Sequence, residues 1–432
     1  MAKELFGVFS PVLGIRKDYP TILLDKVVQV DNSNILRQYG EVHRRQMRDP
    51  DMLDGEGVKS QTPDGNPIIH YHLFVKRSTA TQYFLAFTKA HIYCWNPGSK
   101  EWDLKFTCKA EVIEWDTVSY NDKVIATNNS DMVLVWDTTG YFMPLQNVTP
   151  VDISEATKDD PCKITAVGHG YSTGDRVFIQ DVGGMTEVNN RQFVITKVDN
   201  DNFTLDDEDS TDYEDYTAGG NSTRFEGIEY SEGFYLTRAK YVTTFENFII
   251  LGYVYENGVL HPQRIRWNAI GNETSWKTGD AGSKETEGED FIIGFKIYSG
   301  QLIIFKQRSR IVQRLVATRD VWNWAKLPGN IGGLSNHSIV EDPSGRVYWL
   351  GSDMKFREME LGEISKDIDP IVKLIEPSSD YLVYGAYIDE TGEIWWSIPY
   401  KSALNTKVLT FKNISWGELD LAIPAIGEYK EA

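Results

Sequence analysis

Residues 112–137 read VIEWDTVSYNDKVIATNNSDMVLVWD, a pattern that the rest of the chain repeats. Three segments, 112–120, 123–128 and 132–137, are rich in β-branched and aromatic residues. Asn and Asp, which favour tight turns, separate them. This alternation predicts short antiparallel strands, because successive side chains of a strand point to opposite faces of the sheet.

The same order of segments recurs along the chain. Each unit has an apolar strand, a polar turn, a second apolar strand, a third strand and a fourth segment that usually contains tryptophan. Six units begin near residues 68, 112, 240, 291, 337 and 381, and the fourth segment of the third unit is SWK, ending at Lys277. Such units predict a β-propeller, since neighbouring blades must cover the two apolar faces of each blade.

The predicted fold class is therefore all-β, a β-propeller of about six blades with an inserted small β-barrel domain. A pair of β-sandwiches is the alternative. The predicted domains are an N-terminal arm or hairpin (1–66), the first part of the propeller (67–150), the inserted barrel (151–224) and the remainder of the propeller (225–432). Within the arm, residues 27–47 predict a hairpin that turns near Tyr39 and Gly40 and closes the ring edge or reaches a neighbouring subunit.

The inserted segment differs from the blades in composition. Residues 162–198, CKITAVGHGYSTGDRVFIQDVGGMTEVNNRQFVITKV, combine short apolar alternations with glycines at turns. Since the insertion leaves after one blade and returns at the next, its ends should lie close together and the module should project outward. The loop that follows holds seven carboxylates, Asp206, Asp207, Glu208, Asp209, Asp212, Glu214 and Asp215. It lacks the EF-hand ligand spacing, so a solvated acidic loop is favoured over a calcium site.

Charge and composition exclude several classes of protein. The chain has 44 basic and 63 acidic side chains and a net charge of −19. It should repel polyanions, which argues against sequence-specific nucleic-acid binding but permits transient passage of DNA. The apolar run 248–255 is too short to span a bilayer. Cys94, Cys108 and Cys162 form no CxxC pair and no disulfide framework.

No catalytic, cofactor-binding or metal site is predicted. The chain lacks GxxxxGK[ST], HExxH and GxSxG motifs. His70 and His72 would share one face of a strand, and with His43 or His91 they are a candidate metal site, although no carboxylate can be assigned to orient them. Glycoside hydrolysis needs two carboxylates at a set separation that a sequence does not report.

Aromatic residues carry the remaining alternatives. Five tryptophans, Trp102, Trp276, Trp322, Trp324 and Trp416, are expected to fill the widening wedges between blades, or otherwise to form a platform for carbohydrate. A glycan-binding propeller would expose Trp395, Trp396 and Tyr400. Residues 278–290, TGDAGSKETEGED, are predicted to form a flexible solvated loop, with a gate or a fibre contact as the alternative.

Residues 168–207 resemble the small β-barrel known as the first catalytic cysteine half-domain of ubiquitin-activating enzymes, a module that also recurs in bacteriophage structural proteins. The turn glycines and NNRQF (189–193) carry the resemblance. Ubiquitin chemistry is not implied, because the adenylating and catalytic cysteine domains are not found in this sequence. The relevant usage is the one in phage proteins.

The flanking body is similar to tail proteins of short-tailed bacteriophages that form β-propeller nozzles or hubs at the end of the DNA conduit. Residues 112–137 and FGVFSPVLGIRKDYP (6–20) carry this second resemblance. It implies a virion structural protein without enzymatic activity or cofactor, made in the host cytoplasm. The implied partners are further copies in a homo-oligomeric ring, tail adaptor and tail fibre or spike proteins, and genomic DNA in transient, non-specific passage. A receptor- or glycan-binding tail protein and a polysaccharide depolymerase are the alternatives.

Overall fold

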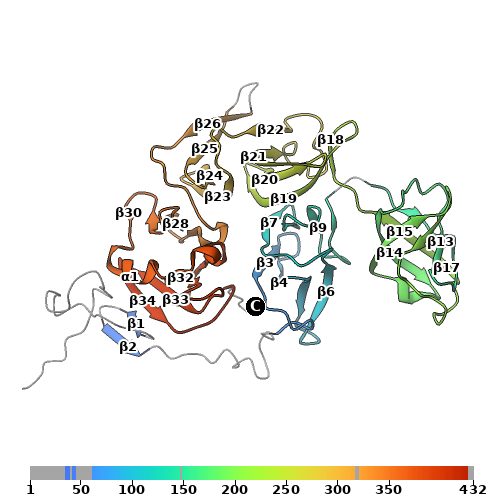
Figure 1. Cartoon of the computed structure of the whole chain (residues 1–432), viewed down its shortest axis with the longest axis horizontal. Helices are drawn as coiled ribbons and strands as arrows, with labels where there is room; N and C mark the ends of the chain where they lie inside the picture. The colour runs from blue at the N-terminus through green and yellow to red at the C-terminus, as the bar shows by residue number, and fades with distance from the viewer. Residues whose placement is uncertain (1–34, 39–40, 45–60, 146–147, 317–320, 427–432) are drawn as a thin grey trace, which may run out of the picture.

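The computed structural model describes residues 35–38, 41–44, 61–145, 148–316 and 321–426. It is nearly all-β, and Figure 1 shows six small sheets around a common centre with a separate small domain at one side. The fold is a six-bladed β-propeller, as predicted, with the second domain inserted between blades 2 and 3.

Blades 1 and 2 are antiparallel sheets whose four strands follow chain order. Asn121 and Asp122, with φ of 45° and 58°, make the turn between the first two strands of blade 2. Asn and Asp tolerate this left-handed backbone better than most residues. Blade 1 consists of β3 (His70–Lys76), β4 (Thr81–Phe87), β5 (His91–Asn96) and β6 (Glu101–Thr107), and blade 2 of β7 (Asp116–Tyr120), β8 (Lys123–Thr127), β9 (Leu134–Trp136) and β10 (Met143–Pro144).

Blade 3 corrects two predictions. SWK (275–277) is not a strand, because Trp276 fills the interface of blades 2 and 3 from a loop and its indole N–H donates to the Glu273 carbonyl (2.7 Å). The outer strand lies instead within the segment predicted to be a flexible loop, at 282–285; its sequence GSKE is polar because this edge faces solvent. The strands of blade 3 are β18 (Ile228–Ser231), β19 (Phe234–Phe245), β20 (Phe248–Glu256), β21 (Val259–Trp267) and β22 (Gly282–Glu285).

Blade 4 follows the prediction, whereas blade 5 begins differently. HSIVED (337–342) starts as a 3-10 turn, η3 (Asn336–Ser338), in which the Ile339 N–H donates to the Asn336 carbonyl (3.0 Å). Blade 4 consists of β23 (Ile292–Tyr298), β24 (Gln301–Lys306), β25 (Arg310–Leu315) and β26 (Trp322–Lys326), and blade 5 of β27 (Val340–Glu341), β28 (Val347–Leu350), β29 (Phe356–Glu358) and β30 (Gly362–Glu363).

Blade 6 completes the ring after a short helical connection. Its strands are β31 (Tyr384–Ile388), β32 (Glu393–Ile398), β33 (Lys407–Lys412) and β34 (Ser415–Leu419), and the connection contains η4 (Lys366–Ile368), α1 (Asp369–Val372) and η5 (Pro377–Leu382). The outer strands β6, β26 and β34 carry tryptophan, but β10, β22 and β30 do not, so the predicted tryptophan-containing fourth strand holds for only half of the blades. None of the helices in the described ranges is long and apolar enough to cross a bilayer.

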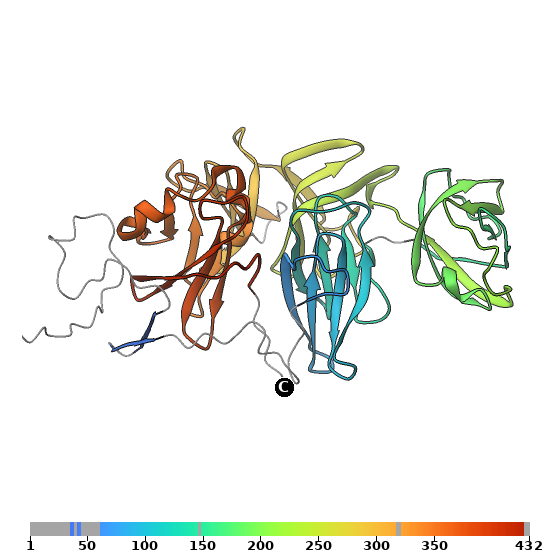
Figure 2. The same ribbon diagram turned by 60° about the horizontal axis from the view of Figure 1, so that its bottom comes forward.

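The inserted domain is a seven-stranded sheet with its own apolar core around Ile164, Ile179 and Phe203. Val151 in its first strand pairs with Ser222 in its last, so the two ends of the insertion lie side by side, as expected. Its elements are β11 (Val151–Asp152), β12 (Glu155–Ala156), β13 (Lys163–Thr165), β14 (Arg176–Gly183), η2 (Thr186–Val188), β15 (Arg191–Lys197), β16 (Asn202–Leu205) and β17 (Ala218–Arg224). Figure 2 shows it standing beside the propeller.

A short hairpin precedes the propeller. It consists of β1 (Ile35–Gln38) and β2 (Glu41–Arg44), on either side of Tyr39 and Gly40. The rest of the predicted N-terminal arm lies outside the described residues, apart from 61–66.

Candidate functional site

The first strands of the blades surround the propeller axis and bring His70 and His72 together. Both residues lie on β3, and both imidazoles form hydrogen bonds with the Thr117 hydroxyl of β7, at 2.7 and 2.8 Å. This agrees with the prediction that they share a face. The second nitrogen of His72 lies 2.9 Å from the Ser119 hydroxyl, so both nitrogens of this ring face hydroxyl groups.

A third histidine, which was not predicted to lie here, also reaches the propeller axis. His337 projects from η3, its ring stacks on Tyr384 at 4.7 Å, and its centroid lies 5.1 Å from that of His70. Tyr384 Oη in turn lies 3.0 Å from His70 Nδ1. Side chains from blades 1 and 6 and from the connection between blades 4 and 5 therefore meet here. We call His70, His72, His337 and Tyr384 the axial cluster.

The two other histidines considered for a metal site do not join this cluster. His91 binds Asp64 through Nδ1 (2.8 Å), and the side chain of His43 lies outside the described residues. The described part of the chain contains no group of three His, Cys, Asp or Glu side chains that could hold a metal ion. Burial lowers the pKa of His70 well below its ordinary value and that of His72 to about 4, which keeps both rings neutral at pH 7.

Carboxylates near the axis are already engaged. Burial raises the pKa of Asp116 to about 7, and its carboxylate accepts the Val242 N–H (2.9 Å). Glu114 pairs with Lys240 at 2.9 Å. A glycosidase needs one carboxyl group held as an acid and a second one free to act as base or nucleophile. Asp116 meets the first condition, whereas Glu114 is held in an ion pair.

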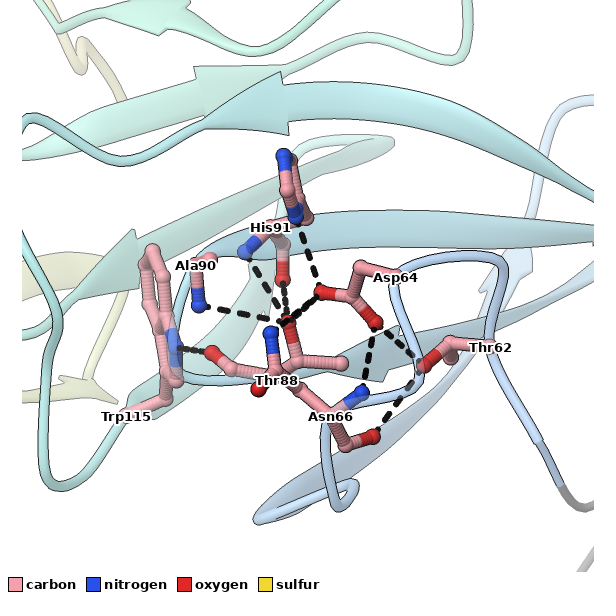
Figure 3. Close-up of polar contacts among 7 residues, drawn as sticks. All are labelled: Thr62, Asp64, Asn66, Thr88, Ala90, His91 and Trp115. Carbon is pink, nitrogen blue, oxygen red and sulfur yellow. Dashed lines mark hydrogen bonds and ion pairs between the residues drawn. The ribbon is translucent and has the colours of Figure 1, made fainter.

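Asp64 organises a polar network where the chain enters blade 1 (Figure 3). Its carboxylate accepts hydrogen bonds from the hydroxyls of Thr62 (2.7 Å) and Thr88 (2.8 Å), from both nitrogens of Asn66 (3.1 Å) and from His91. Burial raises the pKa of Asp64, but these hydrogen bonds outweigh burial and hold it below its ordinary value.

This network also contains a hydroxyl, an imidazole and a carboxylate, the groups of a hydrolase triad. Thr88 is fully buried, and its hydroxyl donates to Asp64 while accepting the N–H groups of Ala90 and His91. A nucleophile would need to donate to the imidazole instead. The arrangement therefore anchors the turn between β4 and β5, which Trp115 braces by donating to the Thr88 carbonyl (2.9 Å).

Of the five tryptophans predicted to fill wedges between blades, Trp276, Trp322 and Trp416 are buried in clusters shared by two blades. Trp102 is buried in a cluster of blade 1 alone, and Trp324 is half-exposed. Of the proposed exposed platform, Trp396 is fully buried between blades 5 and 6, while Trp395 and Tyr400 are half-buried. The three rings therefore do not form a platform, because alternate residues of β32 point to opposite faces of the blade.

An open groove of about 790 Å³ runs between the outer strands of blades 3 and 4. Trp267, Trp322 and Trp324 supply its aromatic walls, and Asp280, Lys284 and Asn323 are among its polar lining residues. The sequence named two of these tryptophans as wedge fillers, but it gave no signal for the groove, since β22 was read as loop. We call this feature the aromatic groove.

The acidic loop of the inserted domain is mostly solvated. Glu208 is buried in a bidentate ion pair with Arg191 (2.5 and 2.6 Å). The side chains of five others, Asp207, Asp209, Asp212, Glu214 and Asp215, are exposed. Asp209 accepts the Thr211 hydroxyl (2.7 Å), an ordinary turn contact. The loop thus presents negative charge outward rather than enclosing a cation.

The inserted domain docks against blades 1 and 2 through Arg176. Its guanidinium pairs with Asp131 (3.1 Å), donates to the Thr107 carbonyl (3.1 Å) and lies over the Phe225 ring. Phe178 belongs to the apolar cluster shared by blades 1 and 2. The module is therefore held to the propeller by an ion pair and an apolar contact as well as by its two connections.

Comparisons with known proteins identify only the inserted module. A search of curated proteins gives no match. Among solved structures, the phage phi92 endosialidase is 14% identical with a TM-score of 0.31 and covers 84% of this chain and 58% of that chain. KlHsv2 with loop 6CD replaced by a Gly-Ser linker is 9% identical with a TM-score of 0.29, and the match covers 82% of this chain and 97% of that chain. Both likenesses are too distant to carry a functional argument. Residues 162–225 match the family model described as the ubiquitin-activating enzyme E1 FCCH domain.

Proposed function

We propose that this chain is a structural protein of a bacteriophage tail, several copies of which form a nozzle or hub ring that continues the DNA channel. The observation that carries the proposal is the combination of a six-bladed propeller with an FCCH-type barrel inserted between two blades. This is the combination implied by the resemblance to phage tail proteins. The ring would help to retain and release the genome, with tail adaptor and fibre or spike proteins as its partners.

The axial cluster determines where DNA would pass. Because His70 and His337 approach to 5.1 Å, a duplex cannot pass through a single propeller. The passage in this proposal is formed between copies that surround the tail axis. A net charge of −19 suits such a wall, since carboxylates repel phosphates and let DNA slide without binding.

We assign no catalytic step to the chain. Glu114 and Asp116 near the axis are paired or bound to backbone, and the Thr62 and Thr88 hydroxyls of the Asp64 network donate to the Asp64 carboxylate. A depolymerase would release oligosaccharides from host surface polysaccharide. We expect the purified chain to release none.

Quantitative mass spectrometry of purified virions tests the proposal. The chain should be present in several copies per particle and should remain with isolated tails after the capsids are removed. Genes for a portal, an adaptor and a terminase should lie near its gene. Absence of the chain from washed particles would contradict the proposal.

A further inference from the structure

The aromatic groove differs from every other tryptophan site that the structure describes. Ten of the twelve tryptophans are buried, and only Trp324 and Trp395 retain partial exposure. Trp324 lines an open groove, whereas the Trp395 indole N–H donates to the neighbouring Glu393 carboxylate (2.9 Å). An indole face that remains open to solvent beside polar side chains is a common element of a binding surface.

The groove is rigid on its aromatic side. The Trp324 indole N–H donates to the Gln313 side chain (3.2 Å), and the Trp267 indole N–H donates to the Asp280 carbonyl (2.6 Å). The two rings lie 5.9 Å apart at an interplanar angle of 44°. Since these rings are fixed before a ligand arrives, little conformational entropy is lost on binding.

The polar side of the groove offers hydrogen bonds. Ser283, Lys284 and Asn323 are exposed along its rim, and the Lys284 ammonium lies 5.5 Å from the centre of the Trp324 ring. Trp322, which lines the groove and is buried, has an indole N–H without a partner in the described part of the chain. Such an unsatisfied donor is unusual in a wall that serves packing alone.

We propose that the aromatic groove binds a saccharide, with a pyranose ring packed on the Trp324 indole. A pyranose presents an apolar C–H face and a rim of hydroxyls, which matches one aromatic wall and a rim of hydroxyl, amide and ammonium groups. A flat aromatic ligand would use the rings but leave the hydroxyl, amide and ammonium groups of the rim unused. The flexible Lys284 side chain moves aside and donates to ring hydroxyls. This inference stands independently of the proposed tail function.

Binding of the full-length chain to an array of bacterial capsular polysaccharides and O-antigen oligosaccharides tests the inference. The wild-type chain should bind at least one saccharide class. In titration calorimetry with that saccharide, Trp324→Ala should weaken affinity at least about tenfold, equivalent to about 1.4 kcal/mol. Trp324→Phe should retain part of the affinity, and Lys284→Ala should lose a smaller factor.

The matched control is Trp395→Ala, which removes the other half-exposed indole and should leave affinity unchanged. Thermal unfolding of each variant shows whether it folds. If Trp324→Ala does not fold, the affinities of Trp324→Phe and Asn323→Ala are compared with that of the wild type instead. Affinity that survives in folded Trp324 variants, or an array on which the wild-type chain binds nothing, would overturn the inference. Neither result would bear on the presence of the chain in a tail ring.

Discussion

Five of the six blade interfaces have a shared cluster of buried apolar side chains, whereas the described residues show a mixed polar and apolar contact at the sixth. One cluster of buried apolar side chains joins each successive pair from blades 1 and 2 to blades 5 and 6. Within the described residues, no such cluster joins blade 6 to blade 1, which we call the closing interface. The apolar face of blade 1 around Phe84 and Trp102 forms a cluster of its own.

The closing interface mixes polar and apolar side chains. His70 of blade 1 meets Tyr384 of blade 6 at 3.0 Å. On the face of blade 6 opposite its apolar cluster, buried Ser397 and Thr410 lie beside buried Val408 and Leu419. Burial of apolar area contributes roughly 25 cal/mol per Å², whereas a hydrogen bond contributes on the order of 1 kcal/mol net. The ring should therefore open first between blades 6 and 1.

The largest expected effect comes from weakening an apolar interface. Trp396 is fully buried between blades 5 and 6, so Trp396→Ala should lower the free energy of unfolding by about 3–5 kcal/mol in urea titrations. Trp395→Ala, on the other face of β32, should lower the free energy of unfolding clearly less. Equal decreases in the two variants would contradict the distinction between the interfaces.

The next largest effect on stability should come from a fall in pH, through the histidines of the axial cluster. Burial lowers the pKa of His70, His72 and His337, so these three rings gain protons in the unfolded chain, but not in the folded one, as the pH falls below about 6.5. The stability that these rings contribute is complete above that pH and is lost toward the folded pKa, about 4 for His72. Asp116, with its pKa raised to about 7, partly opposes the loss, because it stabilises the fold as the pH falls from 7.

Urea unfolding midpoints measured from pH 7.5 to 5 test the predicted loss of stability at low pH. His337→Gln should make the midpoint fall less steeply with pH, and His261→Gln, outside the axial cluster, should leave the pH dependence unchanged. A wild-type midpoint that does not fall over this range would contradict the role given to the cluster.

The Asp64 network should show a moderate effect at the edge of blade 1. Asp64→Asn removes a charged acceptor shared by Thr62, Thr88 and His91, at a cost of about 2 kcal/mol. The pKa of Asp64 is lowered, so its contribution is present above about pH 4 and is lost as the pH falls below that value. The difference in free energy of unfolding between wild type and Asp64→Asn should therefore be larger at pH 7 than at pH 3. Urea titrations at the two pH values measure it. Glu111→Gln, which changes an exposed carboxylate in the connection between blades 1 and 2, serves as the control.

The smallest effect should come from the hydrogen bond across the closing interface. Tyr384→Phe removes the hydroxyl that meets His70 and should cost about 1 kcal/mol. Hydrogen exchange should quicken in β3 and β31 while β19 and β23 keep their protection. Tyr387→Phe, in the same strand, is the control. Faster exchange spread evenly over all six blades would show that the closing interface is not the weak one.

These contrasts also show what the sequence could reveal. Alternating segments such as KVIAT and MVLVWD predicted the strands, because period two is a local property. The same alternation does not identify which neighbouring blade covers each face of a sheet. Neither the closing interface nor the burial of Trp396 could therefore be predicted. His337 was read as strand, and it lies in a turn whose side chain fills the axis. The aromatic groove was missed because its outer wall, GSKE (282–285), is a polar edge strand.

The inserted domain was easier to recognise than its attachment. Its glycine turns and NNRQF (189–193) predicted a compact barrel, and the family match covers residues 162–225. Arg176 carried no signal in the sequence, because an ion pair with Asp131 depends on where two distant segments meet. Local patterns thus identified both domains, while the contacts between them required the structure.

Electron cryo-microscopy of virions that carry this chain is the decisive experiment for the proposed tail ring. We expect density for several six-bladed propellers arranged around the tail axis, each with its barrel beside blades 1 and 2 and with DNA passing between copies rather than through the axial cluster. Tails that lack such a ring, or a chain found as a single copy away from the tail axis, would contradict the proposal.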